Sequence, residues 1–180
     1  MTVPSADLGS LVGSATGIAR EIASVLGRRG QMLAVVETSA GGVACGQLSS
    51  LPGASSWLLG GFVAYATVTR SSWLGIPAER VREVGAVSAE SALDLARAAR
   101  RTLRADWGAA ETGIAGPQNG RRSPKPVGLG YSAVVGVVDG QPFERVVEVQ
   151  SGLDDRSANQ AVFALALITL VRDSLAQADS

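Results

Sequence analysis

Hydrophobic residues follow two spacings along the chain, and these spacings predict helices and strands in turn. Apolar positions recur every three or four residues from Leu11 to Arg29 and after the capping residue Ser88, so these two segments are predicted to be amphipathic helices. A last helix is predicted from about Asp155 to Leu175. Met32 to Val36 is an uninterrupted apolar run, which is typical of a strand covered on both faces.

Shorter elements complete the pattern. Two further strands and two short helices are predicted at Gly61 to Tyr65, Ala109 to Gly113, Gly41 to Ser50 and Thr67 to Leu74. Leu129 to Val138 and Phe143 to Val149 flank Asp139-Gly140, a dipeptide that suits a tight hairpin turn. Gly116 to Pro126, rich in turn-forming residues, is predicted to be a loop.

Strands that alternate with helices, plus one hairpin, predict an α/β fold: a three-layer α/β/α single domain with a mixed sheet. We expect this domain to span residues 11–176, with a flexible N-terminus at 1–10 and a flexible tail at 177–180. A length of 180 residues, 46% of them hydrophobic, suits one such domain.

Composition and charge limit the function classes. A single cysteine, Cys45, cannot form an intramolecular disulfide, and neither a leader pattern nor a long apolar run is evident, so a cytoplasmic protein without a membrane segment is expected. Sixteen basic and sixteen acidic residues give no net charge, which argues against nucleic acid as a partner.

Two absences restrict the chemistry further. The chain has no histidine, which excludes imidazole-based triads and histidine metal sites. Lys125 is the only lysine, and arginine stays protonated and cannot act as a general base. No metal and no cofactor are predicted.

Four segments in chain order carry recognisable motifs. They are Val36-Glu37-Thr38-Ser39-Ala40-Gly41-Gly42, then Gly61-Phe62-Val63-Ala64-Tyr65-Ala66-Thr67-Val68-Thr69-Arg70, then Gly85-Ala86-Val87-Ser88, and finally Thr112-Gly113-Ile114-Ala115-Gly116-Pro117 with Lys125-Pro126-Val127-Gly128 downstream. Together, over roughly Val12 to Leu175, they resemble the CinA C-terminal domain family and its patterns A-E-S-x-T-G-G, G-x-V-x-Y-S-N-x-x-K, T-G-I-A-G-P and K-P-V-G.

The resemblance implies an amidohydrolase that deamidates nicotinamide mononucleotide, with a serine nucleophile and a lysine that accepts its proton. Here Thr38 stands at the serine position and Arg70 at the lysine position. Threonine is a competent nucleophile only beside a base, which a guanidinium is not. Since losing general-base help costs about 100- to 10,000-fold in rate, we expect weak or absent deamidase activity.

Other residues are candidates for catalytic roles, each with a structural alternative. Glu37 is a candidate base, although an orienting or charge-pairing role is more common for a glutamate there. Ser39 is a candidate nucleophile or ligand contact, but adjacent strand residues face opposite ways and it suits the cap of the following helix. Tyr65 is expected either to line the site or to be a buried tyrosine whose hydroxyl is satisfied within the protein. Lys125 is expected either to contact a phosphate of the ligand or to hold its own loop in place.

Anion-binding features match the family better than the catalytic pair does. Gly41-Gly42 before a helix and the Thr112-Gly113-Ile114-Ala115-Gly116 turn after a strand bring backbone N–H groups to one place, as phosphate sites do. Arg70 suits a phosphate or carboxylate ligand, or equally an ion pair within the protein. Arg156 matches a family arginine, or forms a charge pair at a helix start, while Gln160 replaces a second arginine.

Three hypotheses follow. The chain is an amidohydrolase acting on a pyridine nucleotide, a non-catalytic regulatory relative that binds a nucleotide or another phosphate-bearing small molecule, or an assembly domain. A homo-oligomer is expected from the resemblance alone. We further expect Thr38, Tyr65, Arg70 and Thr112 to converge on one cleft, because each falls at or just after a strand end.

Overall fold

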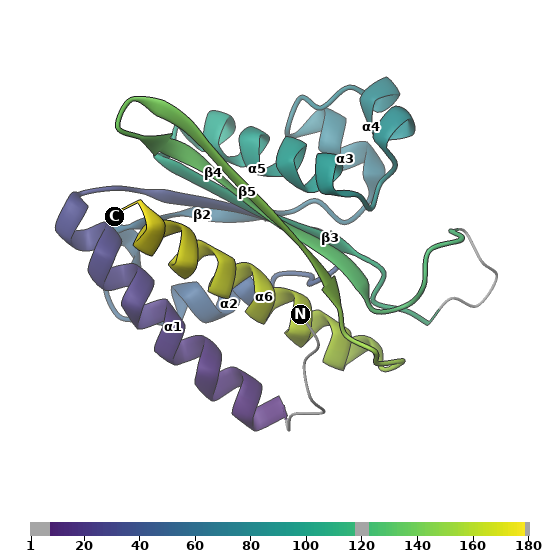
Figure 1. Cartoon of the computed structure of the whole chain (residues 1–180), viewed down its shortest axis with the longest axis horizontal. Coiled ribbons are helices and arrows are strands. Elements are labelled where there is room, and N and C mark those ends of the chain that lie inside the picture. The colour runs from purple at the N-terminus through teal and green to yellow at the C-terminus, as the bar shows by residue number, and fades with distance from the viewer. Residues whose placement is uncertain (1–7, 118–122, 179–180) are drawn as a thin grey trace.

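One mixed sheet of five strands organises the chain (Figure 1). The computed structural model describes residues 8–117 and 123–178. The strands, in the spatial order β2-β1-β3-β4-β5, are β1 (Leu33–Glu37), β2 (Leu58–Val63), β3 (Trp107–Gly113), β4 (Leu129–Val138) and β5 (Gln141–Gln150). β1 pairs in parallel with both β2 and β3, whereas β4 and β5 run antiparallel. The parallel strands therefore all end at one edge.

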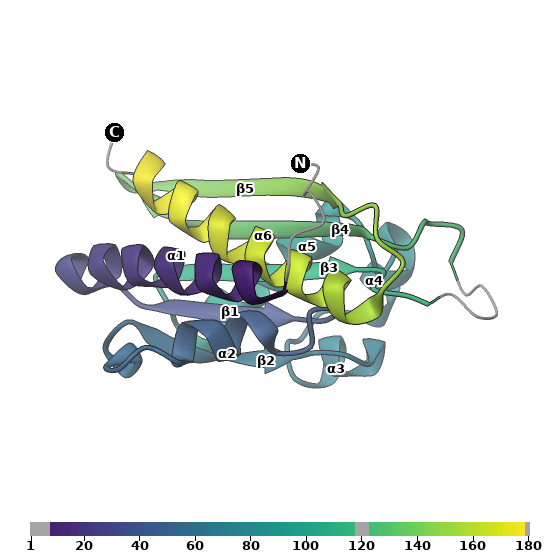
Figure 2. The same ribbon diagram turned by 90° about the horizontal axis from the view of Figure 1, so that it is seen from below.

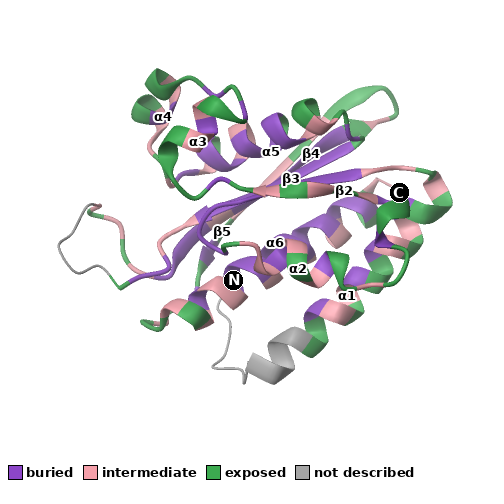
Figure 3. Cartoon of the chain, turned by 180° about the vertical axis from the view of Figure 1, so that it is seen from behind, coloured by how far each residue is buried: buried purple, intermediate pink, exposed green. Residues whose placement is uncertain are grey.

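Helices cover both faces of this sheet, which gives the three-layer α/β/α domain that the sequence predicts (Figures 1 and 2). One face carries α1 (Leu8–Arg29), α2 (Val43–Ser49) and α6 (Arg156–Gln177), and the other carries α3 (Thr67–Ser72), α4 (Ala78–Val84) and α5 (Ala89–Leu103). Each face has its own hydrophobic core, and the central strands β1, β3 and β4 are mostly buried, whereas the edge strands β2 and β5 are not (Figure 3).

Several predicted features are confirmed at the level of single residues. Ser88 caps α5, because its hydroxyl accepts a hydrogen bond from the Ser91 N–H. Asp139 and Gly140 both have positive φ angles, 50° and 76°, as a tight primed turn between β4 and β5 requires.

Boundaries differ in places from the sequence-based expectation. α1 begins at Leu8, so the expected domain boundary at residue 11 falls inside a helix, and α6 continues to Gln177. β2 ends at Val63, which leaves Tyr65 after the strand. α4 is not predicted by the sequence pattern. Of the ends predicted to be flexible, 1–10 and 177–180, residues 1–7 and 179–180 lie outside the described residues, as does part of the predicted loop, 118–122.

α6 is apolar on most sides because it packs in the core. Among the described helices it alone is long and apolar enough to cross a membrane by length and composition, and 61% of that segment is buried in the fold. Phe163 on α6 lies directly against Gly113 of β3 and Gly130 of β4. Most of this helix therefore packs inside the domain.

Candidate active site

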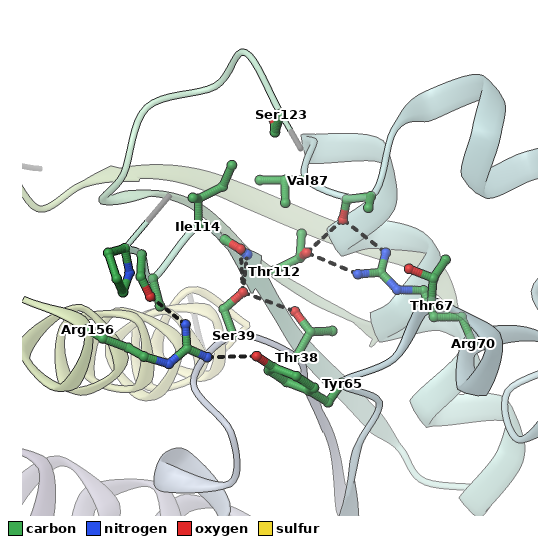
Figure 4. Close-up of a pocket in the computed structure, with 15 residues that line it drawn as sticks. Thr38, Ser39, Tyr65, Thr67, Arg70, Val87, Thr112, Ile114, Ser123 and Arg156 are labelled. Atoms are coloured by element: carbon green, nitrogen blue, oxygen red, sulfur yellow. Dashed lines mark hydrogen bonds between the residues drawn. The ribbon is translucent and has the colours of Figure 1, made fainter. Parts of the chain in front are cut away.

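A pocket of about 480 Å³ lies at the edge where the parallel strands end (Figure 4). It is lined by residues that follow β1 and β2, by the end of β3, by the segment between α4 and α5, and by the start of α6. The predicted convergence of Thr38, Tyr65, Arg70 and Thr112 on one cleft is confirmed. The remaining described lining residues are Ser39, Thr67, Ala86, Val87, Gly113, Ile114, Ala115, Gly116, Pro117, Ser123 and Arg156.

The described side chains that line the pocket carry a net positive charge. Two arginines, Arg70 and Arg156, contribute to it, while the described lining residues include no aspartate, glutamate or lysine. Cationic groups without acidic neighbours on the same wall favour an anionic ligand. No group of three or more potential metal-binding side chains occurs within residues 8–117 and 123–178.

Thr38 and Ser39 both line the pocket, although consecutive strand residues normally face opposite ways. β1 ends at Glu37, so these two residues lie in the turn beyond it and the alternation no longer applies. The Thr38 hydroxyl donates to the backbone oxygen of Glu111 at 3.3 Å and lies 3.5 Å from the Ser39 hydroxyl. No basic nitrogen or carboxylate within the described residues makes a hydrogen bond to the Thr38 hydroxyl.

Ser39 joins the ends of two strands rather than capping a helix. Its hydroxyl donates to the backbone oxygen of Gly113 and accepts the Gly113 N–H at 2.9 Å. The α2 cap is Gly42, without a side-chain cap bond, so the predicted capping role of Ser39 is wrong. Gln160 on α6 fixes the same turn by donating to the Ser39 backbone oxygen at 3.1 Å.

Glu37 is the group that neutralises the start of α2. Its carboxylate is fully buried and accepts the N–H groups of Gly42, Ala44 and Cys45 at 3.0, 3.1 and 2.7 Å. Since Glu37 does not line the pocket, this geometry contradicts the hypothesis that it is a substitute base. Burial and the nearby Glu37 charge raise the pKa of the Cys45 thiol, which makes it a poor nucleophile.

The expected anion site at Gly41-Gly42 is also wrong for the same reason. The N–H groups that begin α2 already bind the Glu37 carboxylate, and neither glycine lines the pocket. The second expected anion site, after β3, remains open to a ligand. The N–H groups of Ala115 and Gly116 make no hydrogen bond to another described residue, and both residues line the pocket.

Arg70 is held in the pocket wall by neutral groups. Its side chain is buried, with 4% of the residue exposed, and it donates to the Ala86 backbone oxygen, the Ser91 hydroxyl and the Thr112 hydroxyl at 2.9, 2.7 and 3.3 Å. Burial lowers the pKa of this guanidinium, and the charge of Glu111 opposes that shift. No carboxylate within the described residues accepts a hydrogen bond from Arg70, so the alternative of an ion pair is not observed.

Tyr65 and Arg156 form the opposite rim of the pocket (Figure 4). Arg156 donates to the Gly116 backbone oxygen at 2.6 Å and to the Tyr65 hydroxyl at 2.8 Å. Tyr65 is 63% exposed, which contradicts the alternative that it is simply a buried tyrosine. Asp155 caps α6 through the Ala158 N–H instead of pairing with Arg156.

Lys125 lies beside the pocket and not in its described lining. Its ammonium donates to the Val87 backbone oxygen and lies 5.8 Å from the centre of the Tyr131 ring. These contacts favour the interpretation that Lys125 holds the loop after β3 against the segment before α5. The hydrogen-bond neighbours of the Thr38 hydroxyl are instead Ser39 and the backbone oxygen of Glu111.

Glu111 is the main residue that sequence reasoning missed. It is 1% exposed, and its Oε1 atom accepts the N–H groups of Thr38 and Ala40 at 2.5 and 2.9 Å, while Oε2 has no hydrogen-bond partner among the described residues. Burial raises the pKa of this carboxyl to about 7, and the Glu37 charge adds to the shift against the effect of the backbone donors. A glutamate immediately before Thr112-Gly113 in a buried strand was the available signal.

Comparisons with known proteins agree with this architecture. Residues 15–175 match the family described as CinA C-terminal domain. A CinA-like protein of Gloeobacter violaceus is 40% identical over 76% of this chain, and one of Anaeromyxobacter sp. strain K is 42% identical over 81%. The aligned regions make up 32% and 35% of those proteins, so this chain spans about a third of the relatives it matches.

Solved structures share the fold over nearly their whole length. The competence/damage inducible protein CihA of Agrobacterium tumefaciens superposes with a TM-score of 0.81 at 28% identity, covering 89% of this chain and 95% of that one. A CinA superfamily protein of Klebsiella pneumoniae gives 0.79 at 21% identity, covering 91% and 98%, which supports the fold alone. With the family match over residues 15–175, this chain belongs to the CinA C-terminal domain family.

Proposed function

We propose that this chain binds a small phosphate-bearing molecule, with a pyridine mononucleotide as the first candidate, and hydrolyses it slowly or not at all. The observation that carries the proposal is the pocket lining, which presents two guanidinium groups and no general base among its described residues. The pyridine nucleotide is suggested by the family resemblance, and the anionic character is supported by Arg70, Arg156 and the N–H groups of Ala115 and Gly116.

The catalytic half of the proposal rests on the two positions that differ from the family pattern. A hydroxyl attacks an amide only when its proton is removed, and the atoms around the Thr38 hydroxyl are a backbone oxygen and another hydroxyl. Arg70 keeps its proton and cannot serve as the acceptor. A cytoplasmic location and assembly as a homo-oligomer remain parts of the proposal.

Ammonia release from nicotinamide mononucleotide tests the catalytic half directly. We expect no release above background for the wild-type chain and for the single variants Thr38→Ser and Arg70→Lys. The double variant should show activity, because only the two changes together pair a less hindered primary hydroxyl with an amine whose pKa can fall on burial. Robust release by the wild-type chain that is lost in Thr38→Val would contradict the proposal.

A further inference from the structure

One edge of the Arg70 guanidinium has no partner within the described residues. An arginine side chain has five N–H donors. Three of these donors make hydrogen bonds: the two on Nη1 bind Ala86 and Ser91, and one on Nη2 binds Thr112. The two that remain are the N–H of Nε, which is buried without an acceptor, and the second N–H of Nη2. These two donors lie side by side, in the arrangement that binds both oxygens of one carboxylate.

The surroundings of this edge suit a small planar anion. Arg70 lies in the pocket wall with Thr38, Thr67 and Thr112, and its accepting neighbours are all neutral (Figure 4). Because the side chain is almost fully buried, the groups that hold it fix the direction of its unused donors. A fixed pair of parallel donors matches two oxygens of one anionic group, such as a carboxylate.

A second cation lies across the pocket. Arg156, beside the exposed Tyr65, lies at the opposite end of the pocket from Arg70 in Figure 4. The N–H groups of Ala115 and Gly116 belong to the same rim. This open end has both the donors and the room for a phosphate.

We propose that the pocket recognises a small molecule with two anionic groups, a carboxylate at Arg70 and a phosphate at the Arg156 rim, and that Arg70 makes it select a carboxylic acid over the matching carboxamide. The inference rests on the proposed function and adds the chemical form of the ligand. A carboxamide turns an NH₂ group toward a guanidinium that has only donors, so one of the two hydrogen bonds is lost. A carboxylate satisfies both donors and also the charge.

Calorimetric titration of the full chain with nicotinate mononucleotide and nicotinamide mononucleotide tests this selectivity. These probes share the phosphate and differ only in the acid or amide group. We expect the acid to bind the wild-type chain about tenfold or more tightly than the amide. Arg70→Lys, which keeps the charge but loses the planar edge, should reduce that ratio several-fold, and Arg70→Gln should abolish it.

Matched variants separate the two ends of the pocket. Arg156→Gln should weaken both ligands by a similar factor and leave their ratio unchanged, whereas Arg20→Gln, on the exposed surface of α1, should change neither affinity. Thermal denaturation shows which variants fold. If Arg70→Gln does not fold, the reduced acid-to-amide affinity ratio expected of Arg70→Lys still tests the inference. The inference is overturned, but not the proposed function, if the wild-type chain binds acid and amide equally. The same holds if the ratio of the two affinities changes in Arg156→Gln and not in the Arg70 variants. Binding of neither ligand overturns both.

Discussion

A single buried acid, Glu111, lies under the turn that carries Thr38. Its carboxyl group accepts two backbone N–H groups of that turn, yet one of its oxygens has no partner within the described residues, and Glu37 places a second carboxylate nearby. Burial therefore raises the pKa of Glu111 to about 7 from an ordinary value of 4.5. Between these values the folded chain holds a proton that the unfolded chain has released.

This difference predicts how stability changes with pH. Because the folded state binds the extra proton, the contribution of Glu111 is fully present below about pH 4.5, decreases as the pH rises, and is lost above about pH 7. The loss should amount to about 3 kcal/mol across that window. Urea unfolding of the wild-type chain and of Glu111→Gln at several pH values measures it. A constant difference between the two proteins from pH 4.5 to 7 would show that the Glu111 pKa is not raised.

At the scale of elements, Glu37 links β1 to α2. Three N–H groups at the start of this short helix end on one carboxylate that is inaccessible to water. Glu37→Gln replaces one accepting oxygen with a donor that faces other donors, so it should lower the free energy of unfolding by about 2 to 3 kcal/mol. Denaturant unfolding is the measurement, with Glu83→Gln, 71% exposed on α4, as the control that should change little. A Glu37→Gln variant as stable as the control would refute this role.

The contact between α6 and the sheet depends on two glycines that leave room for one aromatic ring. A Cβ atom on Gly130 would lie 2.8 and 2.9 Å from carbons of Phe163, and one on Gly113 would lie 2.7 Å from the same ring. Gly130→Ala should therefore destabilise the chain by about 1 to 3 kcal/mol, and Phe163→Leu in that background should cost less than it does alone.

Gly46 provides the comparison for this experiment. It lies within α2, and a Cβ atom there meets nothing within 4 Å, so Gly46→Ala should stabilise the chain by up to about 1 kcal/mol. Thermal or urea unfolding of the four variants settles the point. Equal effects of the two glycine substitutions would mean that backbone freedom, and not the Phe163 ring, governs both sites.

Elements and strand ends could be predicted from the sequence because they depend on local spacing. The helix after Ser88, the turn at Asp139-Gly140 and the convergence of Thr38 with Arg70 all follow from periodicity, caps and parallel strands. What the sequence could not indicate was which buried donor meets which acceptor. The Glu37 carboxylate occupies the N–H groups expected to bind an anion, and Glu111 approaches Thr38 only through the pairing of β1 with β3.

For the whole molecule, the sheet topology explains why the candidate site lies at one edge of the sheet. β2, β1 and β3 run in parallel and end at one edge, where helices from both faces meet the loops (Figures 1 and 2). The two hydrophobic cores lie on either side of the sheet, so the polar groups at the strand ends can vary without altering either core. The polar residues at these strand ends, Thr38 and Arg70 among them, can therefore differ between proteins that share this fold.

A ligand that binds only the folded chain must raise its melting temperature. At a free concentration of about 100 times its dissociation constant, a mononucleotide in the pocket adds about 2.7 kcal/mol to the free energy of unfolding. For a chain of this length, that corresponds to an upward shift of roughly 5 to 10 °C. Thermal scans with nicotinate mononucleotide measure the shift.

Arg156→Gln should reduce this shift in melting temperature at the same ligand concentration. Arg20→Gln should leave it unchanged, since Arg20 lies on α1 and outside the pocket lining. The same shift in all three proteins would place the ligand somewhere other than this pocket, because binding there must depend on the guanidinium at its rim.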